Sequence, residues 1–288
     1  MDGIFILQQI LNGLSFGALL FLVASGFTLT FGLMQIANLA HGAFYVLGAY
    51  VAVVTVAATH NFWIGALAGT LAAATAGLIT ERGLLRRVRG QEMPEVLVTV
   101  GVLIVIADLI LAIFGGHPRS VTSGNGAPSG ALIIGDFAYP QYRLAIIAFT
   151  IVVAAALFIL QKHSRVGAII RAGVDNREMA GAMGINIDRV FTSVFFFGAA
   201  LAGLAGAVGS GLLSLTPGSG TDILLFALVV VIIGGLGSIK GAAVGAVLIG
   251  LIDAFAKAWL PDLSYFTIFA PMALVLVLRP NGLFGRPA

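Results

Sequence analysis

The chain contains no cysteine in its 288 residues, and only 9% of the residues are charged. The missing thiols exclude a disulfide framework and any cysteine nucleophile. Average soluble domains carry roughly 25% charged residues, so most of this surface must face something other than water. The four histidines lack metal-ligand spacing, and no paired carboxylates or nucleophile–base pattern is visible. We therefore expect no metal site and no catalytic residues, and no cofactor bound by this chain.

Hydrophobic residues make up 59% of the sequence, and apolar runs of about 20 residues recur along it. Such a run is long enough to cross the hydrocarbon core as a helix. A closed barrel, the other spanning structure, needs short alternating segments that are absent here. The sequence thus predicts an all-α polytopic membrane protein, a single transmembrane domain over 1–288 with eight or nine crossings. The candidate spans are 4–30, 42–59, 62–80, 94–114, 142–161, 190–213, 222–238, 241–259 and 265–279, of which 222–238 is either a crossing or re-entrant.

The basic residues predict the orientation of these spans. Lys and Arg cluster in the 81–92 loop, in the 162–189 loop and in the tail that begins at Arg279, whereas 115–141 has Arg119 alone. Lys and Arg concentrate in cytoplasmic loops of membrane proteins. The N-terminus is therefore predicted to be external and the C-terminus cytoplasmic. The net charge of +3 then reflects orientation, and we expect no nucleic-acid partner. No basic segment precedes the first run, which favours a first span over a signal peptide.

Polar side chains within the apolar runs are the candidates for a translocation path, because they are costly in hydrocarbon. Gln35, Asn38 and His41 interrupt the sequence between two spans, and Asp108 lies inside 94–114. Two interpretations of 32–50 stay open: a broken helix whose backbone opens toward a cavity, or a cytoplasmic connection whose polar groups cap two helices. Asp108 either faces a wet pathway or hydrogen-bonds a neighbouring helix. Asp253 and Lys257 are one helical turn apart, which favours an internal salt bridge.

Glycine-rich segments have two interpretations. Pairs at four-residue spacing, such as Gly13/Gly17 and Gly241/Gly245, favour ordinary helix packing within the chain over a subunit interface. The segment GGLGSIKG at 234–241 superficially resembles a phosphate loop, but no Ser or Thr follows Lys240. It therefore predicts a helix–helix turn on the cytoplasmic side rather than a nucleotide site.

Four segments together carry a family resemblance: NLAHGAFYVLGAYV, RVGAIIRAGVDNREMAGAMGIN, GGLGSIKGAAVGA and the terminal RPNGLFGR. They resemble the LivH-type permeases of bacterial ABC importers for branched-chain amino acids, in the expected order over nearly the whole chain. The superfamily also holds ribose-type sugar permeases, and close relatives import urea or short amides. The resemblance implies an ABC importer permease fold in the bacterial cytoplasmic membrane and import of leucine, isoleucine and valine. Urea, amides or a sugar are the alternatives, and an ion-coupled secondary transporter using Asp108 is a further one.

The same resemblance implies a role for the polar loop at 162–189. ABC importer permeases share a loop of the form Glu-Ala-Ala, three residues, Gly, and Glu178-Met179-Ala180 with Gly184 is similar to it, without the apolar tail of the fuller motif. Met179, Ala180 and Met183 have helical spacing and predict a small apolar face, and Gly184 predicts a helix stop. The expected ATPase-coupling residues are Arg171, Ala172, Asn176, Glu178, Met179, Ala180, Gly184, Ile185 and Asn186.

The family further implies partners for this chain. These are a second, related permease that forms a heterodimer with it, two cytoplasmic ABC ATPases that hold ATP and Mg²⁺, and a periplasmic substrate-binding protein. ATP closure would move the coupling helix at about 174–186, and the spans would rock between outward-open and inward-open states. We expect this chain itself to perform no covalent chemistry.

Overall fold

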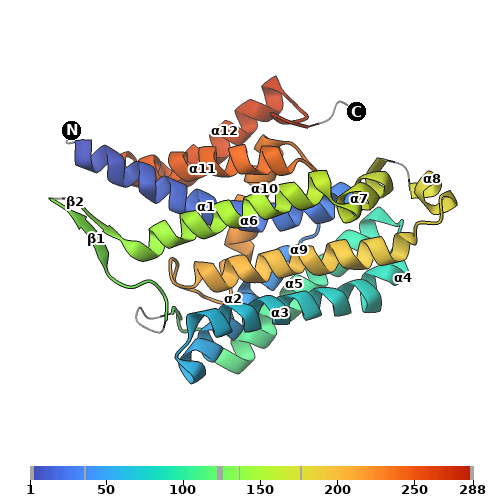
Figure 1. Ribbon diagram of the computed structural model, residues 1–288, viewed down its shortest axis with the longest axis horizontal. Helices are drawn as coiled ribbons and strands as arrows, with labels where there is room; N and C mark the ends of the chain where they lie inside the picture. The colour runs from blue at the N-terminus through green and yellow to red at the C-terminus, as the bar shows by residue number, and fades with distance from the viewer. Residues whose placement is uncertain (1–2, 36, 122–125, 136, 176, 286–288) are drawn as a thin grey trace.

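The computed structural model describes residues 3–35, 37–121, 126–135, 137–175 and 177–285. Helices dominate it (Figure 1), as the apolar runs predict. The helices, in chain order, are α1 Gly3–Met34, α2 His41–Thr59, α3 Phe62–Thr80, the π-helical turn η1 Glu81–Leu85, α4 Arg86–Val88, α5 Glu92–Phe114, α6 Gln141–His163, α7 Arg165–Asp175, α8 Arg177–Ala182, α9 Ile187–Gly209, α10 Ser219–Gly234, α11 Ile239–Trp259, the 3₁₀ turn η2 Pro261–Leu263 and α12 Ser264–Leu278.

Seven helical segments in the described residues are long and apolar enough to cross a membrane: α1, α2, α3 with its extension to Val88, α5, α6, α9 and α11. The predicted 222–238 and 265–279 spans correspond to α10 and α12, which have 16 and 15 residues. The polytopic helical fold is confirmed. The number of crossings stays a prediction, because these two helices are shorter than a span requires.

One short sheet departs from the all-helical expectation. In the 115–141 segment, β1 Ala131–Ile134 pairs antiparallel with β2 Phe137–Pro140, and Ala131 lies opposite Pro140. Leu132, Ile133 and Ile134 of β1 are exposed, whereas Tyr139 of β2 is buried and its hydroxyl donates to Asn12 Oδ1 of α1 at 3.3 Å, so β2 holds the hairpin to the helices. The sequence of this segment is rich in Gly, Pro and Ser, which is typical of a loop and hides so short a strand pattern.

Small residues bring the helices together. Gly13 and Gly17 of α1 lie directly against the backbone of α11 at Gly250 and Ala246. Gly241 and Gly245 of α11 lie equally close to the backbone of α10. In lipid, close packing of this kind replaces the hydrophobic drive for association. The interpretation of these pairs as packing within one chain is confirmed.

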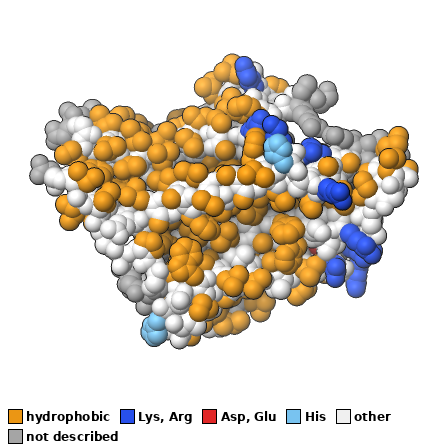
Figure 2. All heavy atoms as spheres, in the orientation of Figure 1, with side chains coloured by type: hydrophobic (Ala, Val, Ile, Leu, Met, Phe, Trp, Pro, Cys, Tyr) orange, Lys and Arg blue, Asp and Glu red, His pale blue; other side chains and the backbone are white. Residues whose placement is uncertain are grey.

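The connections rich in Lys and Arg lie toward one end of the bundle. Figure 1 shows α4, α7, α8 and the C-terminus toward one end of the long axis, and the N-terminus with β1 and β2 toward the other. On the face shown in Figure 2, most Lys and Arg side chains gather toward that same end, over a surface that is otherwise largely hydrophobic. We call it the basic end. The fold therefore agrees with the charge pattern from which the cytoplasmic side is predicted.

Candidate functional site: a helix break at membrane depth and its cavity

Helix α2 begins half-way across the bundle rather than at its end. The His41 Nε2 atom, on the first residue of α2, lies 3.0 Å from the backbone oxygen of Val23 in α1. Beside it, Gly26 of α1 contacts the backbone of Gly198, the middle residue of α9. Helix α1 thus continues toward the basic end past the level at which α2 starts. We call residues 37–40, which precede α2, the returning segment.

The returning segment holds buried polar groups. Asn38 and His41 are both buried, and the Asn38 amide has no hydrogen-bond partner within the described part of the chain. Ala40 precedes α2 without a side-chain cap, and the Leu39 N–H donates to the hydroxyl of Thr99 in α5 at 3.2 Å. Asn38 and His41 therefore do not cap helices at a wetted surface. The structure favours the broken helix of the two interpretations.

A second helix begins at the same depth. Gly220, in the first turn of α10, lies so close to Gly42 of α2 that a Cβ on either would collide with the carbonyl oxygen of the other. Gly218 precedes α10, and no side chain caps this helix end. The first N–H groups of a helix lack intrahelical partners and carry partial positive charge. Two helix N-termini thus meet inside the bundle, as in broken-helix transporters.

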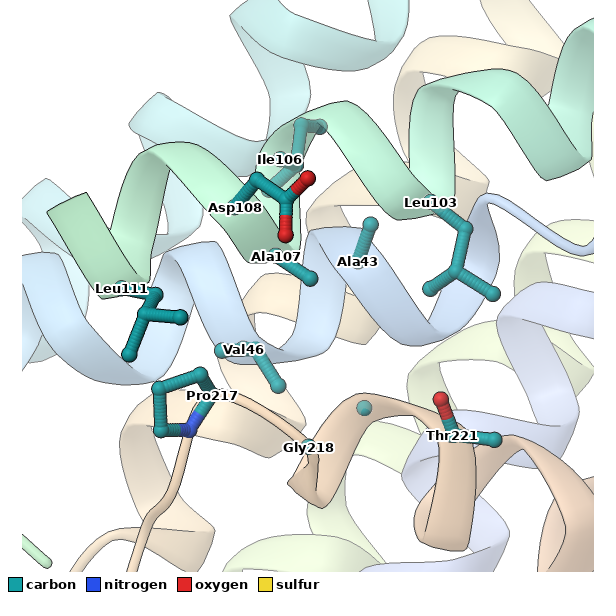
Figure 3. Close-up of a pocket in the computed structure, with 11 residues that line it drawn as sticks. Ala43, Val46, Leu103, Ile106, Ala107, Asp108, Leu111, Pro217, Gly218 and Thr221 are labelled. Atoms are coloured by element: carbon teal, nitrogen blue, oxygen red, sulfur yellow. The ribbon is translucent and has the colours of Figure 1, made fainter. Parts of the chain in front are cut away.

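A cavity of about 230 Å³ lies between these helix starts and α5. Figure 3 shows the Asp108 carboxylate directed toward it from α5, with Pro217, Gly218 and Thr221 on the opposite side and Ala43 and Val46 of α2 between them. Its size is below the roughly 300–1,000 Å³ of typical ligand pockets, so it has room only for a small solute. The apolar part of the lining comes from Ala43, Val46, Leu103, Ile106, Ala107, Leu111 and Pro217.

An acidic side chain lies on one wall of this cavity, and a helix N-terminus, whose first turn also carries Asp222, lies on the other. Asp108 is an exposed side chain, although it lies well inside the span Glu92–Phe114. The start of α10 faces it with partial positive charge. A carboxylate at this depth is unfavourable in lipid and normally faces a wet path or a partner. The arrangement can hold a small solute with a cationic group, an anionic group and an apolar body.

The four predicted path residues do not converge on one site. Asp108 lines the cavity just described, whereas Gln35 lines a separate cavity near the basic end. Asn38 and His41 are buried and line neither cavity. Sequence reasoning did not identify Thr221 and the Gly218–Gly220 backbone, because the close approach of α10 to α2 leaves no local sequence pattern.

The predicted coupling region forms two helices, α7 and α8. Gly184 has φ of +82°, and the Ile185 N–H donates to the Ala180 oxygen at 3.1 Å, so the predicted helix stop is confirmed. Met179 and Met183 are 61% and 78% exposed, but Ala180 is only 4% exposed. The exposed apolar face therefore consists of the two methionines, and Ala180 packs inward.

The other predicted coupling residues lie on both sides of α8. Arg171 is half-buried at the second cavity, and Ala172 is also half-buried. Ile185 packs against the core, and the Asn186 side chain accepts a hydrogen bond from the Arg189 N–H at 3.0 Å, which caps α9. Asn176 and the side chain of Glu178 lie outside the described residues. Their coupling role stays a prediction.

A charge cluster not predicted from the sequence joins the start of α9 to the α3–α5 connection. Arg89 forms ion pairs with both Glu81 and Asp188, and Arg86 pairs with Asp188 at 2.6 Å. Glu81 is 1% exposed and also accepts a hydrogen bond from Thr192 at 2.7 Å. We call these five residues the bracket. It connects the end of the coupling region with the base of the helix that carries Asp108.

Two further charged side chains, Asp253 and Lys257 of α11, pair with each other. Lys257 Nζ lies 2.7 Å from Asp253 Oδ2 on successive turns of α11, so the predicted internal salt bridge is confirmed. Among the residues that the structure describes, no group of three His, Cys, Asp or Glu side chains could hold a metal ion.

Comparisons with known proteins agree with this architecture. Residues 9–278 match the model of the family described as branched-chain amino acid transport system / permease component. The chain is 30% identical to the Salmonella typhimurium high-affinity branched-chain amino acid transport system permease protein LivH, over 99% of this chain and 97% of that protein. It is 29% identical to the Pseudomonas aeruginosa permease BraD, named for the same transport, over 98% and 96%. The Haemophilus influenzae ribose import permease RbsC is 27% identical over 73% and 64%.

Proposed function

The chain belongs to the branched-chain amino acid transport permease family, and we propose that it imports leucine, isoleucine and valine through the cavity between α2, α5 and α10. It is a multi-pass membrane permease. The observation that carries the proposal is the charge arrangement of that cavity, with Asp108 on one wall and the uncapped start of α10 on the other.

A branched-chain amino acid matches the cavity group by group. The Asp108 carboxylate accepts hydrogen bonds from the ammonium group, which is a charge-assisted contact. The N–H groups at the start of α10 and the Thr221 hydroxyl donate to the substrate carboxylate. Leu103, Val46 and the other apolar side chains surround the aliphatic part. These groups would leave part of the substrate uncovered, which suits a site that must release its ligand.

Urea, short amides and sugars carry no net charge, so they would make no use of the opposed charges. These alternatives are therefore less well supported than a zwitterion. The match to the ribose permease covers 64% of that protein at 27% identity, less than the matches to LivH and BraD described above. We retain these solutes as competitors in the experiment below.

Energy would enter through partner subunits. We propose that two cytoplasmic ATPases hold ATP and Mg²⁺ and dock on α8, where the exposed Met179 and Met183 present a deformable apolar surface. The bracket then links the start of α9, which follows α8 in the chain, to η1 and α4, which precede α5. A periplasmic binding protein would deliver the substrate at the opposite end, with the chain in the bacterial cytoplasmic membrane, its N-terminus external and its C-terminus cytoplasmic.

A second, related permease would complete the path. The exposed position of Asp108 supports this, because a carboxylate that faces lipid at membrane depth is unfavourable. A neighbouring permease beside α5 would enclose the cavity and keep the carboxylate away from hydrocarbon. We propose a heterodimer in which this cavity faces the joint between the two permeases.

The experiment is uptake by the complete transporter reconstituted in proteoliposomes with ATP inside. Labelled leucine is offered with excess unlabelled valine, urea, acetamide or ribose as competitor. We expect ATP-dependent leucine uptake that only valine inhibits and that persists after ionophores dissipate ion gradients. Inhibition by urea, acetamide or ribose alone would assign another substrate, and loss of uptake with the gradients would indicate ion coupling.

A further inference from the structure

A second and larger cavity, of about 610 Å³, lies at the basic end of the bundle. Its walls come from α1, the end of α6, α7, the glycine-rich turn before α11 and the C-terminal segment. Along α1 it extends from Thr28 to Gln35, which is about 10 Å at the helical rise. It therefore reaches from the predicted cytoplasmic surface into the apolar part of the bundle.

Three cationic side chains from three different elements line this cavity. They are Lys162 of α6, Arg171 of α7 and Lys240 of α11, and the described lining contains no Asp or Glu. Within the described residues, none of the three forms an ion pair. Among the described side chains, no opposite charge lies beside these three, and nearby positive charges repel one another. An anionic ligand would remove this repulsion.

The rest of the lining is apolar or aromatic. Phe31, Ile170 and Phe284 contribute to the walls, and Phe158 lies with its ring centroid 5.3 Å from Lys240 Nζ. At the deep end, the hydroxyl of Thr28 is buried without a hydrogen-bond partner within the described residues. Buried hydroxyls are normally paired. A ligand that fits must carry negative charge and also occupy apolar space.

We propose that this cavity binds the phosphate headgroup and upper acyl chain of an acidic phospholipid from the cytoplasmic leaflet. Lys162, Arg171 and Lys240 contact the phosphate, and the aromatic walls contact the acyl chain. Basic pockets between transmembrane helices on the cytoplasmic side suit anionic headgroups. A free phosphate ion would satisfy the cations and leave the apolar walls unoccupied, so the whole lining favours the lipid.

The site has a structural consequence for the coupling region. Arg171 belongs to α7, which leads directly to α8, whereas Lys162 and Lys240 belong to α6 and α11. A lipid phosphate between them would tie α7 to two membrane-spanning helices. The inference concerns lipid binding alone and does not depend on which solute the permease carries.

The experiment is native mass spectrometry of the purified full chain in detergent, with dioleoyl phosphatidylglycerol or dioleoyl phosphatidylcholine added. We expect the wild type to retain phosphatidylglycerol and to release phosphatidylcholine. The triple variant Lys162→Gln/Arg171→Gln/Lys240→Gln should lose about 100-fold in phosphatidylglycerol affinity, since each cation near an anionic surface is worth roughly fivefold.

The matched control is Arg82→Gln/Arg87→Gln/Arg165→Gln, which removes three exposed cations from the same end but none from the cavity. It should lose less than about threefold. The charge-preserving variant Lys162→Arg/Arg171→Lys/Lys240→Arg should retain the preference for phosphatidylglycerol, which excludes misfolding as the cause of the loss. Equal losses in both neutralised variants, or equal retention of the two lipids by the wild type, would overturn the proposal. So would displacement of the lipid by millimolar glycerol 3-phosphate, which would assign the site to a free anion.

Discussion

Polar groups in two regions of this chain have opposite surroundings. In the bracket, Arg89 reaches Glu81 and Asp188, and every charge has an opposite charge beside it. At the helix break, the Asn38 amide and the Asp108 carboxylate have no protein partner within the described residues, and Asp108 lines an open cavity. Paired groups hold two elements in one arrangement, whereas unpaired groups remain available to a ligand. In the function we propose, the first region is mechanical and the second binds the substrate.

Breaking the bracket should have the largest effect on stability. Arg89→Met removes the cation from beside the buried Glu81 and should lower the free energy of unfolding by about 3–5 kcal/mol, because an uncompensated buried charge remains. The measurement is equilibrium unfolding in mixed detergent micelles, followed by circular dichroism. Arg87→Met is the control, because Arg87 is exposed and forms no ion pair with any residue that the structure describes, and it should leave the unfolding curve unchanged. The double variant Glu81→Gln/Arg89→Met should regain part of the loss; if it is no better than Arg89→Met, the pairing is not the cause.

Crowding the helix break should have the next largest effect. Gly42→Ala places a Cβ against the Gly220 carbonyl and should destabilise the chain by about 1–3 kcal/mol through overpacking. Gly101→Ala is the matched control, because nothing lies within 4 Å of a Cβ there. Alanine is the better helix former, so this control should be stable or slightly stabilised. The same unfolding measurement compares them, and similar effects from both substitutions would contradict the close approach of α2 and α10.

Removing the hydroxyl that holds the returning segment should have a smaller effect. Thr99→Val deletes the acceptor of the Leu39 N–H and should lower the free energy of unfolding by about 1–2 kcal/mol, since the donor is left unpaired. The control is Thr75→Val. Thr75 is an exposed residue of α3, and its hydroxyl donates to the Ala72 oxygen of the same helix. Hydrogen exchange of the Leu39 amide gives an independent measure. Unchanged exchange in Thr99→Val would show that Thr99 does not secure this segment.

The helix stop after α8 should show the smallest effect. Gly184→Ala puts a side chain at φ of +82°, which costs about 1 kcal/mol locally. The coupling segment should then dock less well on the ATPases, while insertion and folding of the spans stay normal. Co-purification of the ATPases with the permease measures this. Gly83→Ala, at a position with nothing within 4 Å of a Cβ, is the control. Equal ATPase recovery from both variants and the wild type would argue against coupling through α8.

The bounds of the helices could be predicted from the sequence, whereas the contacts between residues of different helices could not. The predicted spans 42–59 and 62–80 agree with α2 and α3 within one residue, because apolar runs and the His60–Asn61 junction mark their limits. The stop at Gly184 was also predicted, from a residue type that tolerates positive φ. These are local properties of the chain.

Contacts between distant residues left no such pattern. Arg86 and Asp188 are 102 residues apart, and the charges of the 81–92 loop indicate only which side of the membrane it occupies. Ala180 was predicted to share a small apolar face with Met179 and Met183, but it is buried while both methionines are exposed, because helical spacing does not show which side of α8 packs against the protein. The cavity of Asp108 depends on α10 starting beside Gly42, and only the packed structure brings these residues together.

The central claim is that Asp108 contacts the substrate in an ATP-driven path, and uptake and ATP hydrolysis measured together test it most directly. In the reconstituted complete transporter, Asp108→Asn should lower leucine uptake about 10- to 100-fold, the worth of a charge-assisted hydrogen bond. ATP hydrolysis stimulated by the binding protein should stay within about twofold of wild type, because the bracket and α8 are intact. Asp262→Asn, outside the cavity, should transport normally. Normal leucine uptake by Asp108→Asn, or a parallel loss of ATP hydrolysis, would contradict the account.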